Sequence, residues 1–197
     1  MSAPDTRPWI ALVRHGRPAH DNPRSLSPAE LGPWIAAYNR AEVGTDRLPP
    51  SLRPLARRAA VVLSSNVSRC VQSRRHLVGE RECRSAEVFA EPHLPHPDWR
   101  FPRLPVTAWR ILLRALWFCG YARHSEPIAR ADARAREAAE QLIALAETHG
   151  SVLLVGHGIM NILIARHLRA RGWAGPRLWV LRAYWHLACY RRTAQRR

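Results

Sequence analysis

Two histidine–glycine pairs stand at matching places far apart in the sequence. His15-Gly16 follows the apolar run 9–13 and Arg14, while His157-Gly158 follows the apolar run 152–155 and one glycine. An imidazole can act as a nucleophile, a base or a hydrogen-bond donor near neutral pH. Backbone amides that begin a loop or helix after a strand favour an anion. The two pairs therefore indicate anion chemistry involving histidine, provided that the fold brings them together.

An arginine and a carboxylate could complete such a site. Arg69 lies shortly after a third apolar run, 59–63, and a planar guanidinium fits two phosphate oxygens at once. Glu91, in the segment VFAEP at 88–92, is a carboxylate that could act as a general acid or base. The nearby acidic side chains are alternatives for this role: Glu82, Glu87 and Asp98.

The elements that must position these residues alternate along the chain. The three continuous apolar runs are typical of strands buried on both faces of a parallel sheet. Ser27-Pro-Ala-Glu30 has the pattern of a capped helix start, and residues 126–149 carry apolar positions at helical spacing before Gly150. We therefore predict an α/β fold, a three-layer α/β/α sandwich with a mostly parallel central sheet, whose ligands bind at the carboxyl ends of the strands.

The chain is predicted to form a single domain, 1–197, with one lid-like insertion over 91–124. Five prolines between residues 92 and 105 break any regular element there. Residues 106–119 then form a helix that is apolar nearly all around, interrupted only by Arg110 and Arg114. An all-round apolar helix is usually internal, so we expect it to be buried under the lid or against the sheet. The alternatives are a homodimer contact and a membrane-surface helix with its arginines among the lipid head groups.

Taken in order, the motifs resemble those of the histidine phosphatase superfamily, the phosphoglycerate-mutase-like group whose N-terminal signature is RHG. The resemblance covers nearly the whole chain and rests on LVRHG at 12–16, SSNVSRCVQS at 64–73, VFAEP at 88–92, Ser125-Glu126 and VLLVGHG at 152–158. The sequence departs from the family at Arg17-Pro18, where an acidic or polar residue followed by threonine is more familiar. An asparagine expected shortly downstream has only Asn22, at an offset position, as a candidate.

The resemblance implies a metal-independent phosphatase that hydrolyses a phosphate monoester through a phosphohistidine on His15. Glu91 would then be the proton donor, while Arg14, Arg69 and His157 would complete the catalytic set. The phosphoryl group would be bound by Arg14, Arg69, His157 and Gly158, and no metal or other cofactor is implied. Crowding His15 with cations lowers its pKa and keeps it neutral for attack. A cation about 4 Å from an oxyanion stabilises it by about 4 kcal/mol at an effective dielectric constant near 20.

Other functions remain open at this point. Within the family, the alternatives are a phosphoglycerate-mutase-type phosphotransferase, which the compact chain disfavours, and a phosphohistidine protein phosphatase. Outside it, the chain could be a catalytically inactive or a nucleic-acid-binding member of the fold. The formal net charge is +16, carried by 31 arginines and no lysine. The arginines are spread along the chain without a dense cluster, which favours a small phosphorylated substrate over nucleic acid.

Cysteine spacing and the N-terminus bear on metals and on the compartment. The four cysteines form no CxxC pair, which favours a reduced compartment. His93 and His96 form an HxxH pair, but the neighbouring prolines exclude a helical ligand face, so we expect no metal site there. The first residues lack a basic region followed by an apolar run. We therefore expect a cytoplasmic protein.

Overall fold

A single mixed sheet forms the centre of the protein. The structure, a computed structural model, describes residues 7–44, 47–178 and 183–193. Its strands are β1 (Trp9–Arg14), β2 (Val61–Ser65), β3 (Arg84–Ala86), β4 (Ser151–Gly156), β5 (Trp173–Ala174) and β6 (Leu187–Arg192), arranged in the order β3-β2-β4-β1-β6-β5. The first four strands of that order are parallel, whereas β6 runs antiparallel to β1 and β5 antiparallel to β6. The predicted mostly parallel sheet is confirmed.

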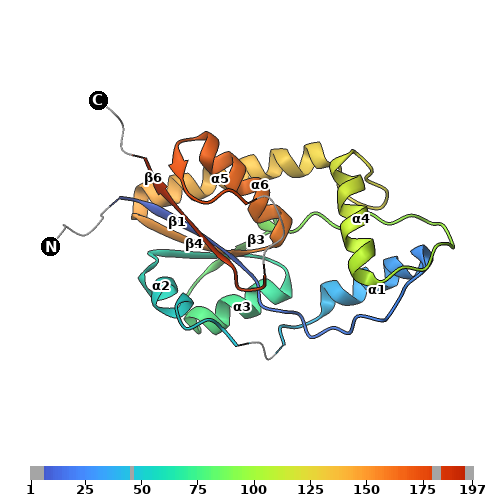
Figure 1. Cartoon of the computed structure of the whole chain (residues 1–197). Coiled ribbons are helices and arrows are strands. Elements are labelled where there is room, and N and C mark those ends of the chain that lie inside the picture. The colour runs from blue at the N-terminus through green and yellow to red at the C-terminus, as the bar shows by residue number, and fades with distance from the viewer. Residues whose placement is uncertain (1–6, 45–46, 179–182, 194–197) are drawn as a thin grey trace.

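Helices cover both faces of this sheet (Figure 1). They are α1 (Pro28–Arg40), α2 (Leu52–Arg58), α3 (Ser68–Val78), α4 (Val106–Phe118), α5 (Ile128–His149) and α6 (Gly158–Ala170), with a 3₁₀ turn, η1, at Glu87–Phe89. Alternate side chains of β1 pack into two separate cores, one on each face of the sheet. Ile10 and Leu12 pack in a core with α5 and α6, whereas Ala11 and Val13 pack in a second core with α2 and α3. The three-layer sandwich is therefore confirmed.

Local sequence signals set the helix ends. Ser27 donates its backbone N–H and its hydroxyl to the carboxylate of Glu30 over 2.7 Å each, which fixes the start of α1. Gly150 adopts φ +83° and ends α5 directly before β4, a left-handed conformation that favours glycine. The start of α5 lies two residues later than predicted because Pro127 is its N-cap, and this leaves Glu126 outside the helix.

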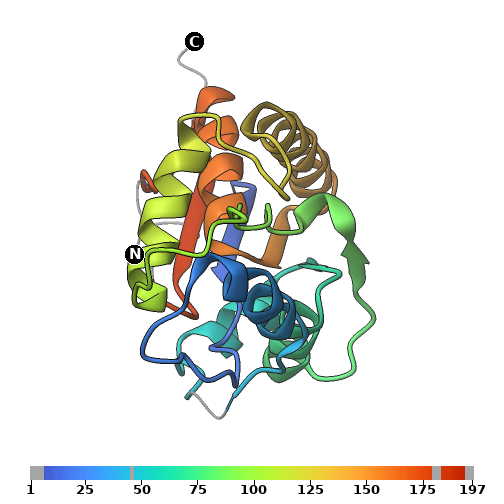
Figure 2. The ribbon, with the colours of Figure 1, turned by 90° about the vertical axis from the view of Figure 1, so that its right-hand side faces the viewer.

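The helices α1 and α4 lie together beyond the carboxyl ends of the strands (Figures 1 and 2). A separate small core joins them, made by Leu26, Leu31, Val106, Trp109 and Leu113. The indole N–H of Trp109 also donates to the carbonyl of Leu26 over 2.8 Å. Residues 91–105 contain neither a helix nor a regular strand, so the irregular segment predicted from the prolines is confirmed.

The expected all-round burial of α4 is wrong. One face is buried, through Val106, Trp109, Leu113 and Trp117, but Ile111, Leu112 and Phe118 are exposed. The buried face packs against α1 and reaches the start of α5, and no element among the described residues covers the opposite face. None of the helices in the described part of the chain is long and apolar enough to span a bilayer.

Candidate active site

The sheet register brings the two predicted histidines together. Strands β1 and β4 are parallel neighbours with Arg14 opposite Gly156, so His15 and His157 leave adjacent strand ends. The two rings lie 5.1 Å apart at 66°, and only 2% and 1% of these residues are exposed. The predicted convergence of the two histidine–glycine pairs is therefore observed.

Close packing holds the backbone after His15 in place. The N–H of Gly16 donates to the hydroxyl of Ser73 over 2.9 Å, and that hydroxyl donates to the carbonyl of Arg69 over 2.6 Å. A Cβ on Gly16 would lie 2.6 Å from the ring of Trp185 and 2.8 Å from Val43. Any other residue at position 16 would therefore displace the loop that carries His15 or the side chains of Trp185 and Val43.

Arg69 bridges the two histidines. It lies one residue into α3, and its Nε donates to Nε2 of His15 and its Nη2 to Nδ1 of His157, each over 3.3 Å. Nη1 donates to Oδ1 of Asn39 over 3.4 Å, and the guanidinium lies 5.2 Å from the ring centre of Tyr38. Arg69 is 3% exposed, and it has no carboxylate partner within the described ranges. A buried cation without a counter-ion is costly, so this arrangement favours an incoming anion.

His15 is held neutral, with its Nε2 unprotonated. Its Nδ1 lies 2.7 Å from the carbonyl oxygen of Gly16, which can only accept, so Nδ1 carries the proton. The unprotonated Nε2 therefore keeps its lone pair, toward which Arg69 points. Burial, and then the charges of Arg69, Arg14 and Arg110, lower the pKa of His15 well below its ordinary value of 6.5, against the opposing bond to Gly16.

His157 is neutral for similar reasons. Burial is the largest cause that lowers its pKa well below 6.5, followed by the charge effects of His15 and Arg69. Because Arg69 can only donate, Nδ1 of His157 is an acceptor, and Nε2 donates to the hydroxyl of Ser65 over 3.0 Å. A phosphate dianion entering beside it would favour protonation of Nδ1 and turn this acceptor into a donor.

Arg14 lies at the end of β1, against a tyrosine that the sequence patterns did not identify. Its guanidinium is 4.4 Å from the ring centre of Tyr184, and the same ring lies 5.6 Å from that of His15. The turn that carries Tyr184 is bonded to the catalytic loop, since the N–H of Trp185 donates to the carbonyl of Arg14 over 3.1 Å. The preceding sequence contains no motif from which this aromatic neighbour could be found.

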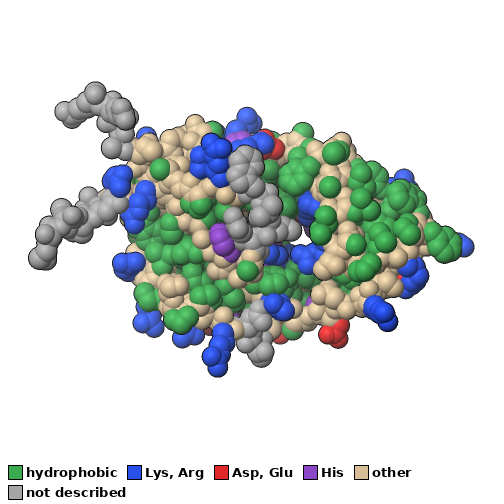
Figure 3. Space-filling view, in the orientation of Figure 1, with side chains coloured by type: hydrophobic (Ala, Val, Ile, Leu, Met, Phe, Trp, Pro, Cys, Tyr) green, Lys and Arg blue, Asp and Glu red, His purple; other side chains and the backbone are tan. Residues whose placement is uncertain are grey.

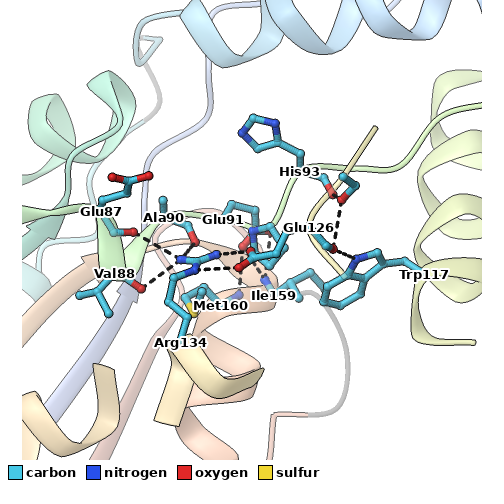
Figure 4. A network of polar contacts seen from close by, with 12 residues as sticks. Glu87, Val88, Ala90, Glu91, His93, Trp117, Glu126, Arg134, Ile159 and Met160 are labelled. Atoms are coloured by element: carbon cyan, nitrogen blue, oxygen red, sulfur yellow. Dashed lines mark hydrogen bonds and ion pairs between the residues drawn. The ribbon is translucent and has the colours of Figure 1, made fainter. Parts of the chain in front are cut away.

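Glu91 lies at the N-terminus of α6 (Figure 4). Its carboxylate accepts from the backbone N–H of Ile159 over 3.1 Å and of Met160 over 3.0 Å. These free amides and the helix dipole stabilise a negative charge at this position. The helix that follows His157 therefore also fixes the candidate proton donor.

Arg134 of α5 holds the segment that leads to Glu91. Its Nη1 donates to the carbonyls of Glu87, Val88 and Ala90 over 3.3, 3.0 and 2.7 Å. The opposite edge of the guanidinium pairs with both carboxylate oxygens of Glu126 (Figure 4). Arg134 is thus a positioning residue. Glu126 of the Ser125-Glu126 pair noted in the sequence anchors it and does not line the cavity with the histidines.

These groups surround one cavity of about 380 Å³ between α1, α4 and the strand ends. It contains all five predicted catalytic residues: Arg14, His15, Arg69, Glu91 and His157. Gly158, predicted to bind substrate, begins α6 but is not among the lining residues.

The alternative acids Glu82, Glu87 and Asp98 do not line this cavity. Asn39 of α1 lines it, whereas the predicted Asn22 does not. Asn39 and Tyr38 were not predicted because helical spacing alone does not show which side of α1 faces the strand ends.

Arg110 and Arg114 also line this cavity. They are the two charged residues of α4, and both line the cavity that contains the histidines, whereas a helix with its arginines among lipid head groups would direct them outward. Arg114 donates to the carbonyl of Pro92 over 3.2 Å. Arg110 has no hydrogen bond or ion pair with any other residue that the structure describes, and its charge acts on His15.

One group of side chains outside the cavity has the types and spacing of metal ligands. His96, Asp98 and His124 offer ligand atoms within 4.8 Å of one another. Asp98 already accepts from His124 over 2.9 Å and pairs with Arg123. His93 of the HxxH pair is not part of this group. The carboxylate of Asp98 therefore already has two partners within the protein, His124 and Arg123.

Solved structures share this fold at low sequence identity. A mycobacterial glucosyl-3-phosphoglycerate phosphatase in complex with inorganic phosphate is 18% identical, with a TM-score of 0.56 over 92% of this chain and 88% of that one. YhfR of Bacillus stearothermophilus is 16% identical, with a TM-score of 0.58 over 92% and 89%. A phosphoserine phosphatase of Entamoeba histolytica in complex with 3-phosphoglyceric acid is 14% identical, with a TM-score of 0.51 over 82% and 80%.

The chain therefore has the mixed α/β, phosphoglycerate-mutase-like fold of these solved structures. These structures confirm the fold expected from the resemblance. Comparison by sequence finds no matching family model and no matching curated protein.

The buried neutral histidines predict a pH dependence of stability. Both have a pKa well below 6.5 in the folded chain, whereas unfolding returns them to about 6.5. Below pH 6.5 the unfolded chain therefore binds more protons, and the free energy of unfolding falls as the pH falls from about 7 to 5. In urea unfolding, His15→Gln and His157→Gln should each reduce this slope by up to about 1.4 kcal/mol per pH unit. His76→Gln, an exposed control on α3, should leave it unchanged; an equal effect of all three variants would contradict the assignment.

Proposed function

We propose that this chain is a metal-independent phosphatase that hydrolyses a phosphate monoester through a phosphohistidine on His15. The observation that carries the proposal is Arg69, a buried cation that joins two neutral histidines and lacks a carboxylate partner among the described residues. A phosphoryl group supplies the missing negative charge and places phosphorus next to Nε2 of His15. The phosphatases among the solved structures of the same fold support this interpretation.

In the first step, the lone pair of Nε2 on His15 attacks phosphorus. A nitrogen–phosphorus bond forms, the bond from phosphorus to the ester oxygen breaks, and that oxygen takes a proton from the carboxyl of Glu91. The bond from Nδ1 to Gly16 holds the ring in the required tautomer and spreads the positive charge that develops.

In the second step, water attacks the phosphohistidine. The carboxylate of Glu91 takes a proton from that water, a phosphorus–oxygen bond forms, and the electron pair of the nitrogen–phosphorus bond returns to Nε2. Inorganic phosphate leaves, and the enzyme regains its neutral imidazole. A single carboxyl group acts as acid and then as base, which the position of Glu91 on the cavity wall permits.

Guanidinium groups stabilise the charge on the phosphoryl oxygens. Arg14 and Arg69 flank the nucleophile, and His157 becomes a donor once it is protonated. Hydrolysis of a phosphate monoester needs accelerations of up to about 10²¹, so several preorganised charges must act together. We propose that these arginines take the place of metal ions in this reaction.

The charges in the cavity also suggest a substrate with a second anionic group. Four arginines line it, namely Arg14, Arg69, Arg110 and Arg114, against the one carboxylate of Glu91. Glu91 is protonated when it acts as the acid, so it does not neutralise Arg110, which has no hydrogen bond or ion pair with the other described residues. A carboxylate on the same small substrate would pair with Arg110. The enclosing helix α4 and the volume of about 380 Å³ favour such a substrate over the surface of a phosphoprotein.

His15→Ala should lower kcat/KM for p-nitrophenyl phosphate by about a thousandfold or more, because it removes the nucleophile. The intact protein should keep full activity in excess chelator. His76→Ala, an exposed control, should behave as the intact protein does. Equal hydrolysis by His15→Ala, or loss of activity with chelator, would overturn the proposed mechanism.

Glu91→Gln should affect substrates according to their leaving group. An alkyl phosphate needs a proton on its leaving oxygen, so kcat should fall by about 10² to 10⁴, whereas p-nitrophenyl phosphate should lose much less. The matched control is Glu87→Gln, which removes the exposed alternative acid. A loss that is the same for both substrates, or the leaving-group signature in Glu87→Gln, would assign the acid elsewhere.

Arg110→Gln tests the second anionic group. The intact protein should hydrolyse 3-phosphoglycerate with a kcat/KM about tenfold higher than glycerol 3-phosphate, which corresponds to about 1.4 kcal/mol from one ion pair. The variant should lose this preference but keep its activity on p-nitrophenyl phosphate, while the exposed control Arg136→Gln should keep both. An unchanged preference in Arg110→Gln would show that Arg110 does not select the substrate.

A further inference from the structure

The helix α4 carries large apolar residues on its exposed side as well as on its buried side. Its two charged residues, Arg110 and Arg114, line the cavity instead of facing solvent. Ile111 is 73% exposed, and Leu112 and Phe118 are exposed by nearly half. A surface helix normally shows its charges to water and its apolar stripe to the core. The outer face of α4 is therefore built to contact something other than water.

The segment before α4 extends the same surface. Trp99 is 56% exposed and Phe101 is 78% exposed. Together with the three residues of α4, they are the large apolar side chains that are exposed within the described part of the chain. Figure 3 shows the hydrophobic side chains gathered over α4 and the adjoining segment, at the end of the molecule farthest from both termini. We call these five residues, Trp99, Phe101, Ile111, Leu112 and Phe118, the apolar end.

Arginines accompany the apolar end. Arg100 and Arg103 alternate with its aromatic residues and are exposed, as is Arg123 on the loop after α4. Two of these arginines have carboxylate partners, because Arg103 pairs with Glu30 over 2.9 Å and Arg123 pairs with Asp98, which also accepts from His124. Three arginines against two carboxylates leave the rim with a net positive charge, of the same sign as the net charge of +16 of the whole chain.

We propose that the apolar end docks on an anionic lipid surface. Aromatic and aliphatic side chains of a helix and loop would enter the interfacial region, while Arg100, which has no carboxylate partner among the described residues, contacts the acidic head groups. The charge argues against a second copy as the occupant, because an isologous contact would bring two positively charged rims together. Nucleic acid would satisfy the arginines but not the exposed aliphatic residues of α4. Docking of α4 would place the wall of the substrate cavity at the membrane surface.

Vesicle flotation tests this proposal with the full chain. The intact protein should float with vesicles of phosphatidylcholine and phosphatidylglycerol in equal parts, more weakly with phosphatidylcholine alone, and less as salt is raised. Ile111→Glu should weaken binding by about tenfold, since it places a charge in the interfacial region. Ala133→Glu makes the same change of charge at an exposed position of α5 and should retain binding. Both variants should keep the activity of the intact protein on p-nitrophenyl phosphate, which confirms folding.

Three outcomes would overturn the proposal. The first is that the intact protein fails to float with the acidic vesicles. The second is that Ile111→Glu and Ala133→Glu bind equally well, since the apolar end would then have no part in binding. The third is a dimer in sedimentation experiments that Ile111→Glu dissociates while no variant binds lipid, which would assign the apolar end to a second copy of the chain.

Discussion

One buried guanidinium organises the candidate site. Arg69 lies between His15 and His157, and it donates to both rings over 3.3 Å. This charge helps to hold both imidazoles in the neutral form, and its own burial requires an anion that the described residues do not provide as a carboxylate. The unprotonated nitrogen of His15 and the phosphoryl binding that we propose thus have a common cause. The sheet makes this contact possible, because β1, β2 and β4 end side by side. The segments that follow them carry His15, Arg69 and His157 to one point.

The remaining polar groups are positioned by contacts that lie farther from the reaction. Glu91 is fixed by the first amides of α6, and the chain before it is held by Arg134, which binds three carbonyls and Glu126. The helix α4 closes the cavity and turns its two arginines inward. Because both arginines of α4 line the cavity, the large exposed side chains of this helix are apolar: Ile111, Leu112 and Phe118. The proposed specificity of the cavity and the proposed attachment to lipid are therefore two consequences of the same helix.

Local sequence patterns were sufficient to predict the parts of this structure that depend on them. Continuous apolar runs identified β1, β2 and β4, and the two histidine–glycine pairs predicted a site at their carboxyl ends. Ser27, Glu30 and Gly150 marked the ends of helices through their own hydrogen bonds and backbone preferences. The strands β3 and β5 are too short for a periodic pattern, with three and two residues. Arg110 and Arg114 indicated a polar stripe on α4, but only tertiary packing could decide that this stripe faces a cavity and that the apolar side faces outward. Tyr184 was missed because its turn is placed by backbone bonds to the loop of His15.

The stereochemistry at phosphorus tests the central claim, attack by His15, most directly. A chiral thiophosphate monoester can be hydrolysed in isotopically labelled water, and the configuration of the inorganic thiophosphate product can be determined. Two successive in-line displacements, the first by Nε2 of His15 and the second by water, invert phosphorus twice and give overall retention. Overall inversion would show that water attacks the ester in a single step, and it would contradict a covalent intermediate on His15.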